Sequence, residues 1–436
     1  MAVSPTSSRF AAFALLQAVL RKKQVLDEAM EILPALKALE KRDRAFVHML
    51  VATALRRLGQ VDAVIKACLD KPQELKADAH DVLRLGAVQI LFMATPPHAA
   101  VDTMVDLAAS LNTTQPFKGL INAVLRRLTR EGQDLLTKQD AARLNTPDWL
   151  WLCWRKAYGV ALARQIAEAH LGEAFPDITV KANASKETEG RWAKKLGARL
   201  LPTQSLRLDG LTPIAELPGF QEGKWWVQDA AAALPVKLLG DVHGRHVVDL
   251  CAAPGGKTMQ LAAMGARVTA VDRSAKRLER LKDNLERSKL EAEIVCRDAL
   301  AYAPETKADL VLLDAPCSTT GTIRRHPDVV RLKGIEDVTR MADLQRRLLD
   351  YTVNKVLAPG GTLVYAVCSL QPEEAEQQIG ELLHRHPALN RVPLKPDEVP
   401  GTAGFISPAG DLRCLPCHWP EWGGIDGFYA ARLTMK

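Results

Sequence analysis

Five short segments in the second half of the chain combine residues that could carry out chemistry. Each is a run rich in Val or Leu that ends at an acidic residue or a thiol: VVDLCAAPGGKT, TAVDRS, IVCRDA, LLDAPC and VYAVCS. Such runs are typical of strands that are covered on both faces in a parallel sheet. Because parallel strands end at one edge of the sheet, we expect the side chains that follow them to lie close together.

The first segment resembles a triphosphate-binding loop because it ends in Gly256-Lys257-Thr258. That loop also requires a glycine at position 251, which is Cys251 here, and the dinucleotide pattern G-x-G-x-x-G is absent. Small residues in such a turn let a bulky ligand approach the backbone closely. The turn comprises Cys251, Ala252, Ala253, Pro254, Gly255, Gly256 and Lys257. The sequence therefore predicts a ligand site that does not depend on phosphate.

Two carboxylates follow the next two predicted strands. Asp272 closes the second strand, where an acidic residue in open α/β sheets accepts the hydroxyls of a bound ribose. Asp298 closes the third strand, where a carboxylate can receive an adenine amino group. Together with the small-residue turn they predict a pocket for S-adenosylmethionine, because the positively charged sulfonium favours an acidic, uncrowded site.

Two thiols follow the last two of the five predicted strands. Asp314 and Cys317 close the fourth strand, and Cys368 closes the fifth. Cytosine C5 attacks a methyl donor only after a thiolate has added to C6, and a base must later remove the C5 proton. Asp314 could bond the N3/N4 edge of that cytosine, and Lys257 could lower a thiol pKa or position Asp314. From the residues alone, either thiol could be the nucleophile.

The chain of 436 residues is long enough for two or three domains. Residues 1–140 show helical periodicity, and residues 145–235 indicate a small α+β segment. From residue 236 to 436, strands alternate with helices predicted at 275–288 and 336–356. We therefore predict an α/β protein whose C-terminal domain is a doubly wound, Rossmann-like sheet preceded by an all-α domain.

A basic helix is predicted from Phe117 in the segment FKGLINAVLRRLTR. An apolar stripe is formed by Leu120, Ile121, Val124, Leu125 and Leu128, and the cationic residues are Lys118, Arg126, Arg127 and Arg130. The cations could form an ordinary solvated face or a surface that contacts RNA phosphates. A net charge of +7 is compatible with a nucleic-acid partner.

Several other sites are not expected. No long uncharged apolar run or export signal occurs, which favours a cytoplasmic protein with reduced thiols and no membrane association. Cys414-Leu-Pro-Cys417-His418 matches a haem-attachment pattern, but that chemistry needs export, and zinc would need a second ligand pair. We therefore expect no metal, and since no dimerisation seam is recognisable, we expect a monomer.

The C-terminal part closely resembles the Sun/Fmu (RsmB-type) family of ribosomal RNA (cytosine-5)-methyltransferases. The resemblance rests on DLCAAPGGKT, AVDRS, RDA, LLDAPCSTTG-x-IRRHPD and VYAVCSLQPEE, which occur in the family's order. The first 140 residues, including KGLINAVLRR, resemble the NusB-type RNA-binding domain, and WWVQDAAAALP resembles the entry into the family's catalytic domain.

This resemblance implies C5 methylation of a cytosine in 16S ribosomal RNA, with S-adenosylmethionine as donor. It makes Cys368 the nucleophile and gives Cys317 a role in product release, whereas DNA enzymes attack with the Pro-Cys thiol. It places the donor at residues 251–257, Asp272, Asp298 and Asp314. The family usually has Thr before the nucleophile, where this chain has Val367. The alternatives are the same chemistry on transfer RNA and an inactive RNA-binding assembly factor.

Overall fold

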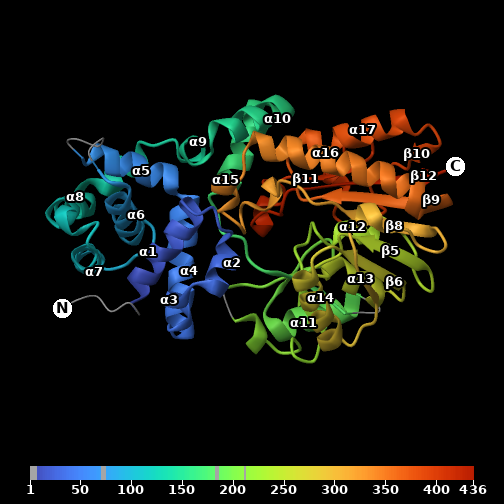
Figure 1. Cartoon of the computed structure of the whole chain (residues 1–436), viewed down its shortest axis with the longest axis horizontal. Coiled ribbons are helices and arrows are strands. Elements are labelled where there is room, and N and C mark those ends of the chain that lie inside the picture. The colour runs from blue at the N-terminus through green and yellow to red at the C-terminus, as the bar shows by residue number, and fades with distance from the viewer. Residues whose placement is uncertain (1–6, 70–74, 182–185, 211–212) are drawn as a thin grey trace. The chain divides into compact units, whose positions relative to one another are not determined.

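The computed structural model describes residues 7–69, 75–181, 186–210 and 213–436. The chain forms two compact units, shown in Figure 1. The first comprises Met1–Gly172 and Ile323–Lys333, and the second comprises Glu173–Thr322 and Gly334–Lys436. Within the described ranges, no helix is both long and apolar enough to cross a membrane.

The first unit is built from helices, as the periodicity predicts. They are α1 (Ser8–Leu20), α2 (Leu26–Ile32), α3 (Pro34–Lys37), α4 (Lys41–Arg56), α5 (Leu58–Ala67), α6 (Ala77–Leu91), α7 (Pro97–Ser110), α8 (Lys118–Thr137), α9 (Ala141–Asn145), α10 (Asp148–Ala169) and α15 (Val329–Leu332). On α8, Ile121, Val124, Leu125 and Leu128 enter the core. Leu120 is 42% exposed, so its predicted place in the apolar stripe is wrong. Leu120 precedes the buried Ile121 by one residue, and this places its side chain beside the buried face of the helix rather than on it.

Two segments join the first unit from outside the predicted helical region. Helix α10 belongs to this unit, although the sequence pattern assigns it to the segment at 145–235. Its Trp154 is buried and lies 5.2 Å from the ring of His170. The segment Ile323–Lys333 is held by the buried carboxylate of Asp328, which accepts a hydrogen bond from the Leu26 backbone N–H at 2.9 Å.

A small antiparallel sheet opens the second unit. Its strands are β1 (Asp177–Val180), β2 (Arg199–Leu200), β3 (Leu206–Arg207) and β4 (Trp225–Val227), in the order β2-β3-β1-β4, with helix α11 (Lys186–Leu196) between β1 and β2. A buried ion pair joins Arg207 Nε to Asp177 Oδ1 at 2.7 Å. Asp177 Oδ2 also accepts a hydrogen bond from the Ala230 backbone N–H, which fixes the small sheet to the chain that leads into the large one.

The large sheet confirms the predicted doubly wound architecture. Its strands are β5 (His246–Leu250), β6 (Arg267–Asp272), β7 (Glu293–Cys296), β8 (Ala308–Asp314), β9 (Leu357–Val367), β10 (Leu389–Arg391), β11 (Leu412–Cys414) and β12 (Phe428–Met435). The order is β10-β12-β9-β8-β5-β6-β7, and β11 pairs with β12. Strands β5 to β9 are parallel, and β12 is antiparallel to β9. The chain order reverses between β5 and β8, the place where such sheets bind ligands.

Helices cover both faces of this sheet, which explains the nearly continuous apolar strands. The helices are α12 (Leu234–Lys237), α13 (Gly256–Ala263), α14 (Ala275–Ser288), α16 (Ile335–Tyr351) and α17 (Glu376–Arg385). Helices α16 and α17 pack on the face that carries Val248 and Leu313, and α12 and α13 pack on the face that carries Val247 and Leu312. Helix α14 begins and ends where the sequence predicts, and α16 continues as one π-helical turn at Thr352–Val356.

Candidate active site

The turn after β5 is shaped by backbone conformations that few residues adopt. Cys251 has φ +62°, and Gly255 has φ +105° at the N-cap of α13. A Cβ on residue 255 would lie 2.9 Å from Leu281 Cγ, so both the dihedral and the space require glycine. The Ala253 backbone N–H donates to Asp272 Oδ2 at 3.2 Å, which ties the turn to the end of β6.

Two of the three predicted donor-binding carboxylates, Asp272 and Asp298, line one cavity with Cys251 and Pro316, whereas Asp314 is not part of its lining. Asp272 is buried at the end of β6. Asp298 lies two residues beyond the end of β7, so it does not close that strand as predicted. Its Oδ1 instead accepts a hydrogen bond from the Leu300 backbone N–H and caps a short 3₁₀ turn. Arg277 also lines the cavity, with Nη1 3.6 Å from Asp272 Oδ2. Sequence reasoning missed Arg277, which appeared only as one of many charges on a polar helix.

Asp249 is fully buried next to this turn. Burial raises its pKa to about 7, although the Thr258 hydroxyl donates to Oδ2 at 2.6 Å and opposes the shift. The other oxygen, Oδ1, has no hydrogen-bond partner among the described residues. A buried polar atom of this kind is a natural acceptor for a donor group on a bound ligand.

The raised pKa of Asp249 predicts a contribution to stability that falls with increasing pH. The folded state holds the proton more tightly than the unfolded state, so the stabilisation is complete below pH 4 and is lost as pH rises to about 7. The slope should approach about 1.4 kcal/mol per pH unit. We expect Asp249→Asn to remove this contribution, measured as the pH dependence of the difference between wild type and variant in the free energy of urea unfolding of the ligand-free protein between pH 5 and pH 8. Replacement of the exposed Asp309 by Asn is the matched control, and an equal slope in Asp249→Asn would contradict the assignment.

The two thiols meet at the ends of β8 and β9. Cys317 Sγ lies 3.4 Å from Cys368 Sγ, and both cysteines are free. Cys317 is buried, whereas Cys368 is partly exposed. The hydrogen bond to Cys368 and burial raise the pKa of Cys317 well above its usual value. Cys317 therefore keeps its proton and can donate a hydrogen bond to the Cys368 sulfur.

A partly buried ion pair lies beside the thiols. Lys257 Nζ donates to Asp314 Oδ2 at 2.7 Å, and its ammonium lies 5.1 Å from the centre of the Phe428 ring. Burial acts to lower the pKa of Lys257, but the attraction of Asp314 outweighs it and the pKa is raised. Cys368 also contributes to that rise, so the positive charge and the thiol interact. Lys257 is thus a fixed cation that faces both Asp314 and the thiol.

Glu374 joins the two loops that carry the thiols. This fully buried carboxylate accepts a hydrogen bond from the Ser318 backbone N–H at 2.8 Å and further bonds from the hydroxyls of Ser318 and Ser369. Gln345 on α16 donates to the same carboxylate. Because Ser318 follows Cys317 and Ser369 follows Cys368, these bonds fix the separation of the sulfur atoms. The only sequence signal that Glu374 joins the two loops is that a Cys-Ser pair occurs twice, at 317–318 and 368–369, and that Pro-Glu-Glu follows the second pair.

The remaining candidate residues lie elsewhere. Lys118, Arg126, Arg127 and Arg130 are on α8 in the first unit, where Arg127 forms an ion pair with Glu131 at 2.8 Å. Val367 is fully buried in the core under β9, so a side chain at this position faces the helices rather than solvent. Among the residues that the structure describes, no cluster of His, Cys, Asp and Glu suits a metal ion.

Known proteins resemble this chain over nearly its whole length. The model of the 16S rRNA methyltransferase RsmB/F family matches residues 236–434, and the NusB family model matches residues 6–130. Ribosomal RNA small subunit methyltransferase B of Erwinia tasmaniensis is 36% identical over 99% of both chains, and that of Cronobacter sakazakii is 37% identical over 95% of this chain and 96% of its own.

Solved structures agree with these relatives. The crystal structure of PH0851 has a TM-score of 0.73 at 26% identity and covers 99% of both chains. A methyltransferase homolog from Pyrococcus horikoshii has a TM-score of 0.54 at 25% identity and covers 71% of this chain and 98% of its own. The order of the motifs and the doubly wound sheet agree with these relatives, which are 36% and 37% identical to this chain over nearly its full length. The chain therefore belongs to the ribosomal RNA small subunit methyltransferase B family, whose members are enzymes that use S-adenosylmethionine.

Proposed function

We propose that this enzyme methylates C5 of a cytosine in 16S ribosomal RNA through a covalent bond between Cys368 and cytosine C6. The observation that carries the proposal is the pair of thiols 3.4 Å apart, of which the buried Cys317 holds its proton. Direct methylation of a ring nitrogen or a hydroxyl has no need for two adjacent thiols. Methylation of cytosine C5 needs one thiol to activate the ring.

The residues around the turn after β5 fit S-adenosylmethionine. Asp272 would accept the ribose hydroxyls, and Asp298 would accept the adenine amino group above the apolar side chains of Leu344 and Leu348, which line the same cavity. The unpartnered Oδ1 of Asp249 would accept a hydrogen bond from the ammonium group of the methionine part. When bound, S-adenosylmethionine supplies a methyl group on a positively charged sulfur.

The first step follows from the charges around Cys368. The hydrogen bond from Cys317 and the nearby cation of Lys257 stabilise the Cys368 thiolate, which adds to cytosine C6. Electron density moves into the ring, and C5 becomes an enamine carbon that takes the methyl group. Asp314, held by Lys257, would bond the N3/N4 edge of the cytosine and stabilise the charge that develops there.

Product release requires loss of the C5 proton and then of the Cys368 sulfur. The hydrogen bond and the negative charge of Cys368 are causes of the raised pKa of Cys317. Once Cys368 is bonded to C6 it is a neutral thioether, so these two causes disappear and Cys317 becomes more acidic. Cys317 would then lose its proton to solvent, and its thiolate would take the C5 proton. The electrons of the C5–H bond form the C5–C6 double bond, the C6–sulfur bond breaks, and the Cys368 thiolate leaves.

The first unit supplies a surface for RNA in this proposal. Lys118, Arg126 and Arg130 are exposed on α8, where cations can contact phosphates. We propose that residues 1–140 dock the RNA, residues 145–235 link the parts, and residues 236–436 catalyse. An unpaired cytosine is the favoured target, because a base outside a duplex enters an active site at little cost.

The proposal is tested with S-adenosylmethionine labelled on its methyl group. Wild-type protein is incubated separately with unmodified 16S ribosomal RNA, transfer RNA and duplex DNA, and each product is digested to nucleosides. We expect labelled 5-methylcytidine from ribosomal RNA only. Label in transfer RNA alone would keep the chemistry and overturn the substrate. Donor binding without label in any nucleic acid would favour an assembly factor without activity.

A further inference from the structure

A second cavity lies in the second unit, away from the thiols. It has a volume of about 250 Å³ and is bounded by β1, β4, α12, α13 and the segment at residues 398–400. It shares no lining residue with the cavity that contains Asp272 and Asp298. An engineered cavity of about 150 Å³ takes up benzene, so this volume suits a substituted ring.

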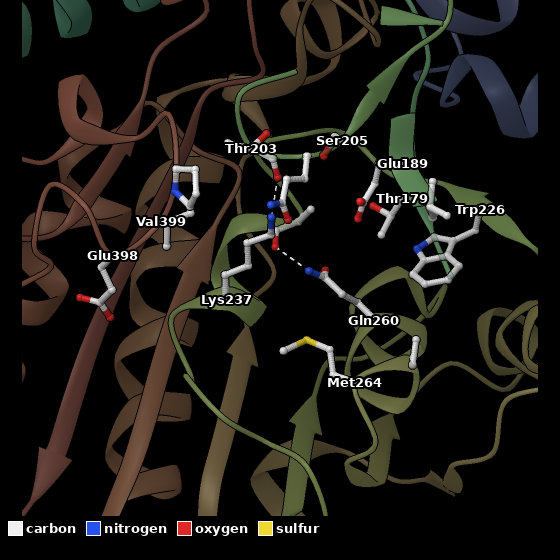
Figure 2. A pocket seen from close by; sticks show the side chains of 15 residues that line it. Thr179, Glu189, Thr203, Ser205, Trp226, Lys237, Gln260, Met264, Glu398 and Val399 are labelled. Carbon is white, nitrogen blue, oxygen red and sulfur yellow. Dashed lines mark hydrogen bonds between the residues drawn. The ribbon is translucent and has the colours of Figure 1, made fainter. Parts of the chain in front are cut away.

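The apolar part of the lining is fixed before any ligand binds. Trp226 and Met264 both line the cavity, as Figure 2 shows. Trp226 Nε1 donates to Gln228 Oε1 at 2.9 Å, and Gln228 Nε2 donates to Gln260 Oε1 at 3.0 Å. Gln260 in turn donates to the Ala233 carbonyl at 2.9 Å. These polar groups are satisfied by one another, so they hold the wall in place and leave ligand recognition to other residues.

Three oxygen atoms in the lining lack partners. Glu189 Oε2, Thr179 Oγ1 and Thr203 Oγ1 are buried and make no hydrogen bond with any described residue. Glu189 as a whole is 6% exposed and Thr203 is 1% exposed. Figure 2 shows Glu189 and Thr179 together on the side of Trp226. Each unpaired buried group lowers stability, and a native structure that keeps three of them around one cavity indicates a ligand that pairs with them.

A cation faces the same space. Lys237 Nζ donates a hydrogen bond to the Thr203 carbonyl, and among the described residues this ammonium makes no other hydrogen bond. An ammonium group has three N–H donors, so donors remain for a ligand. Burial lowers the pKa of Lys237, and the charge of Glu189 opposes this shift. The negative charge of Glu189 and the positive charge of Lys237 therefore balance one another in the cavity. This balance disfavours a ligand with a strong charge of either sign.

We propose that this cavity binds a neutral nucleobase that carries both an exocyclic amino group and a ring carbonyl, namely guanine or cytosine. The amino group donates to Glu189, the carbonyl accepts from Lys237, and the flat ring packs against the apolar side chains of Trp226 and Met264. Adenine lacks the carbonyl and uracil lacks the amino group, so each can pair with one of the two charged residues only through a ring nitrogen, which projects less far than an exocyclic group. The base belongs either to a free nucleoside or to an unpaired residue of an RNA chain. The inference does not depend on the proposed methyl transfer.

Equilibrium binding of radiolabelled guanosine, cytidine, adenosine and uridine to the full-length protein tests the proposal. We expect guanosine and cytidine to bind saturably and about tenfold or more tightly than adenosine and uridine, because each of the latter two replaces one hydrogen bond of an exocyclic group by one of a ring nitrogen that reaches less far. Short single-stranded RNAs that contain one guanosine or one cytidine form a second arm. Binding of the RNAs but not of the nucleosides would assign the base to an RNA chain. Equal binding of all four bases in both arms, or no saturable binding in either, would overturn the proposal.

Variants separate this cavity from the active site. Glu189→Gln should weaken guanosine binding about tenfold or more, because it removes a charged acceptor. Ala263→Leu fills the cavity and should abolish binding, and the thermal unfolding midpoint shows whether each variant is folded. The exposed Glu222→Gln is the matched control and should bind normally. Asp314→Asn should also bind guanosine normally; loss of binding in Asp314→Asn with retention in Glu189→Gln would place the base in the active site and contradict the inference.

Discussion

Replacement of Cys368 by alanine is expected to lower the rate of methyl transfer to RNA by at least about 10³-fold, as with loss of other covalent nucleophiles. Without the thiol, C6 gains no substituent and C5 stays too weakly nucleophilic to accept the methyl group. The effect should be on the chemical step. Lys257 and Asp314 pair with one another and are untouched, so the affinity for S-adenosylmethionine should change little.

The measurement is single-turnover transfer of labelled methyl to RNA, with donor affinity from titration calorimetry. Cys296→Ala is the matched control, because Cys296 is a free thiol that is exposed at the end of β7. We expect normal transfer by that variant. Normal transfer by Cys368→Ala would show that the nucleophile has been assigned to the wrong thiol, whereas loss of donor affinity would point to a structural effect.

Replacement of Cys317 by alanine is expected to trap the enzyme on its RNA. Cys368 can still add to C6 and C5 can still take the methyl group, but the base that removes the C5 proton is missing. The C6–sulfur bond then persists, and a protein–RNA band should accumulate in denaturing gels. Loss of the hydrogen bond from Cys317, now 3.4 Å from Cys368, should also slow the first addition.

The double variant Cys317→Ala/Cys368→Ala controls this experiment, since it lacks the sulfur that forms the bond. It should give no band, and digestion of the trapped RNA from Cys317→Ala should release a peptide that contains Cys368. A trapped species in the double variant, or full turnover by Cys317→Ala, would be incompatible with the two roles. Cys317→Ser is a useful intermediate, because its hydroxyl keeps a hydrogen-bond donor but is a much weaker acid than a thiol.

The sequence by itself determined the five parallel strands of the large sheet and the edge at which its chemistry lies. Strands covered on both faces must be apolar throughout, and helices must alternate with these strands along the chain. The local pattern therefore predicts both the strands and the helices. Parallel strands share one carboxyl edge, which is why Asp272, Asp314, Cys317 and Cys368 could be expected together from their positions alone. Helix α14 even begins and ends at the predicted residues.

Tertiary structure decided everything that depends on contacts between distant segments. Glu374 holds Ser318 across an interval of 56 residues, and no local pattern reports such a bond. The protonated state of Cys317 depends on a sulfur 51 residues away and on burial. Helix α10 joins the first unit because Trp154 is buried there, whereas its sequence is equally compatible with the following segment. The cavity at Glu189 likewise exists only where β1, α12 and α13 meet. Periodicity records which face of an element is buried, but not which partner buries it.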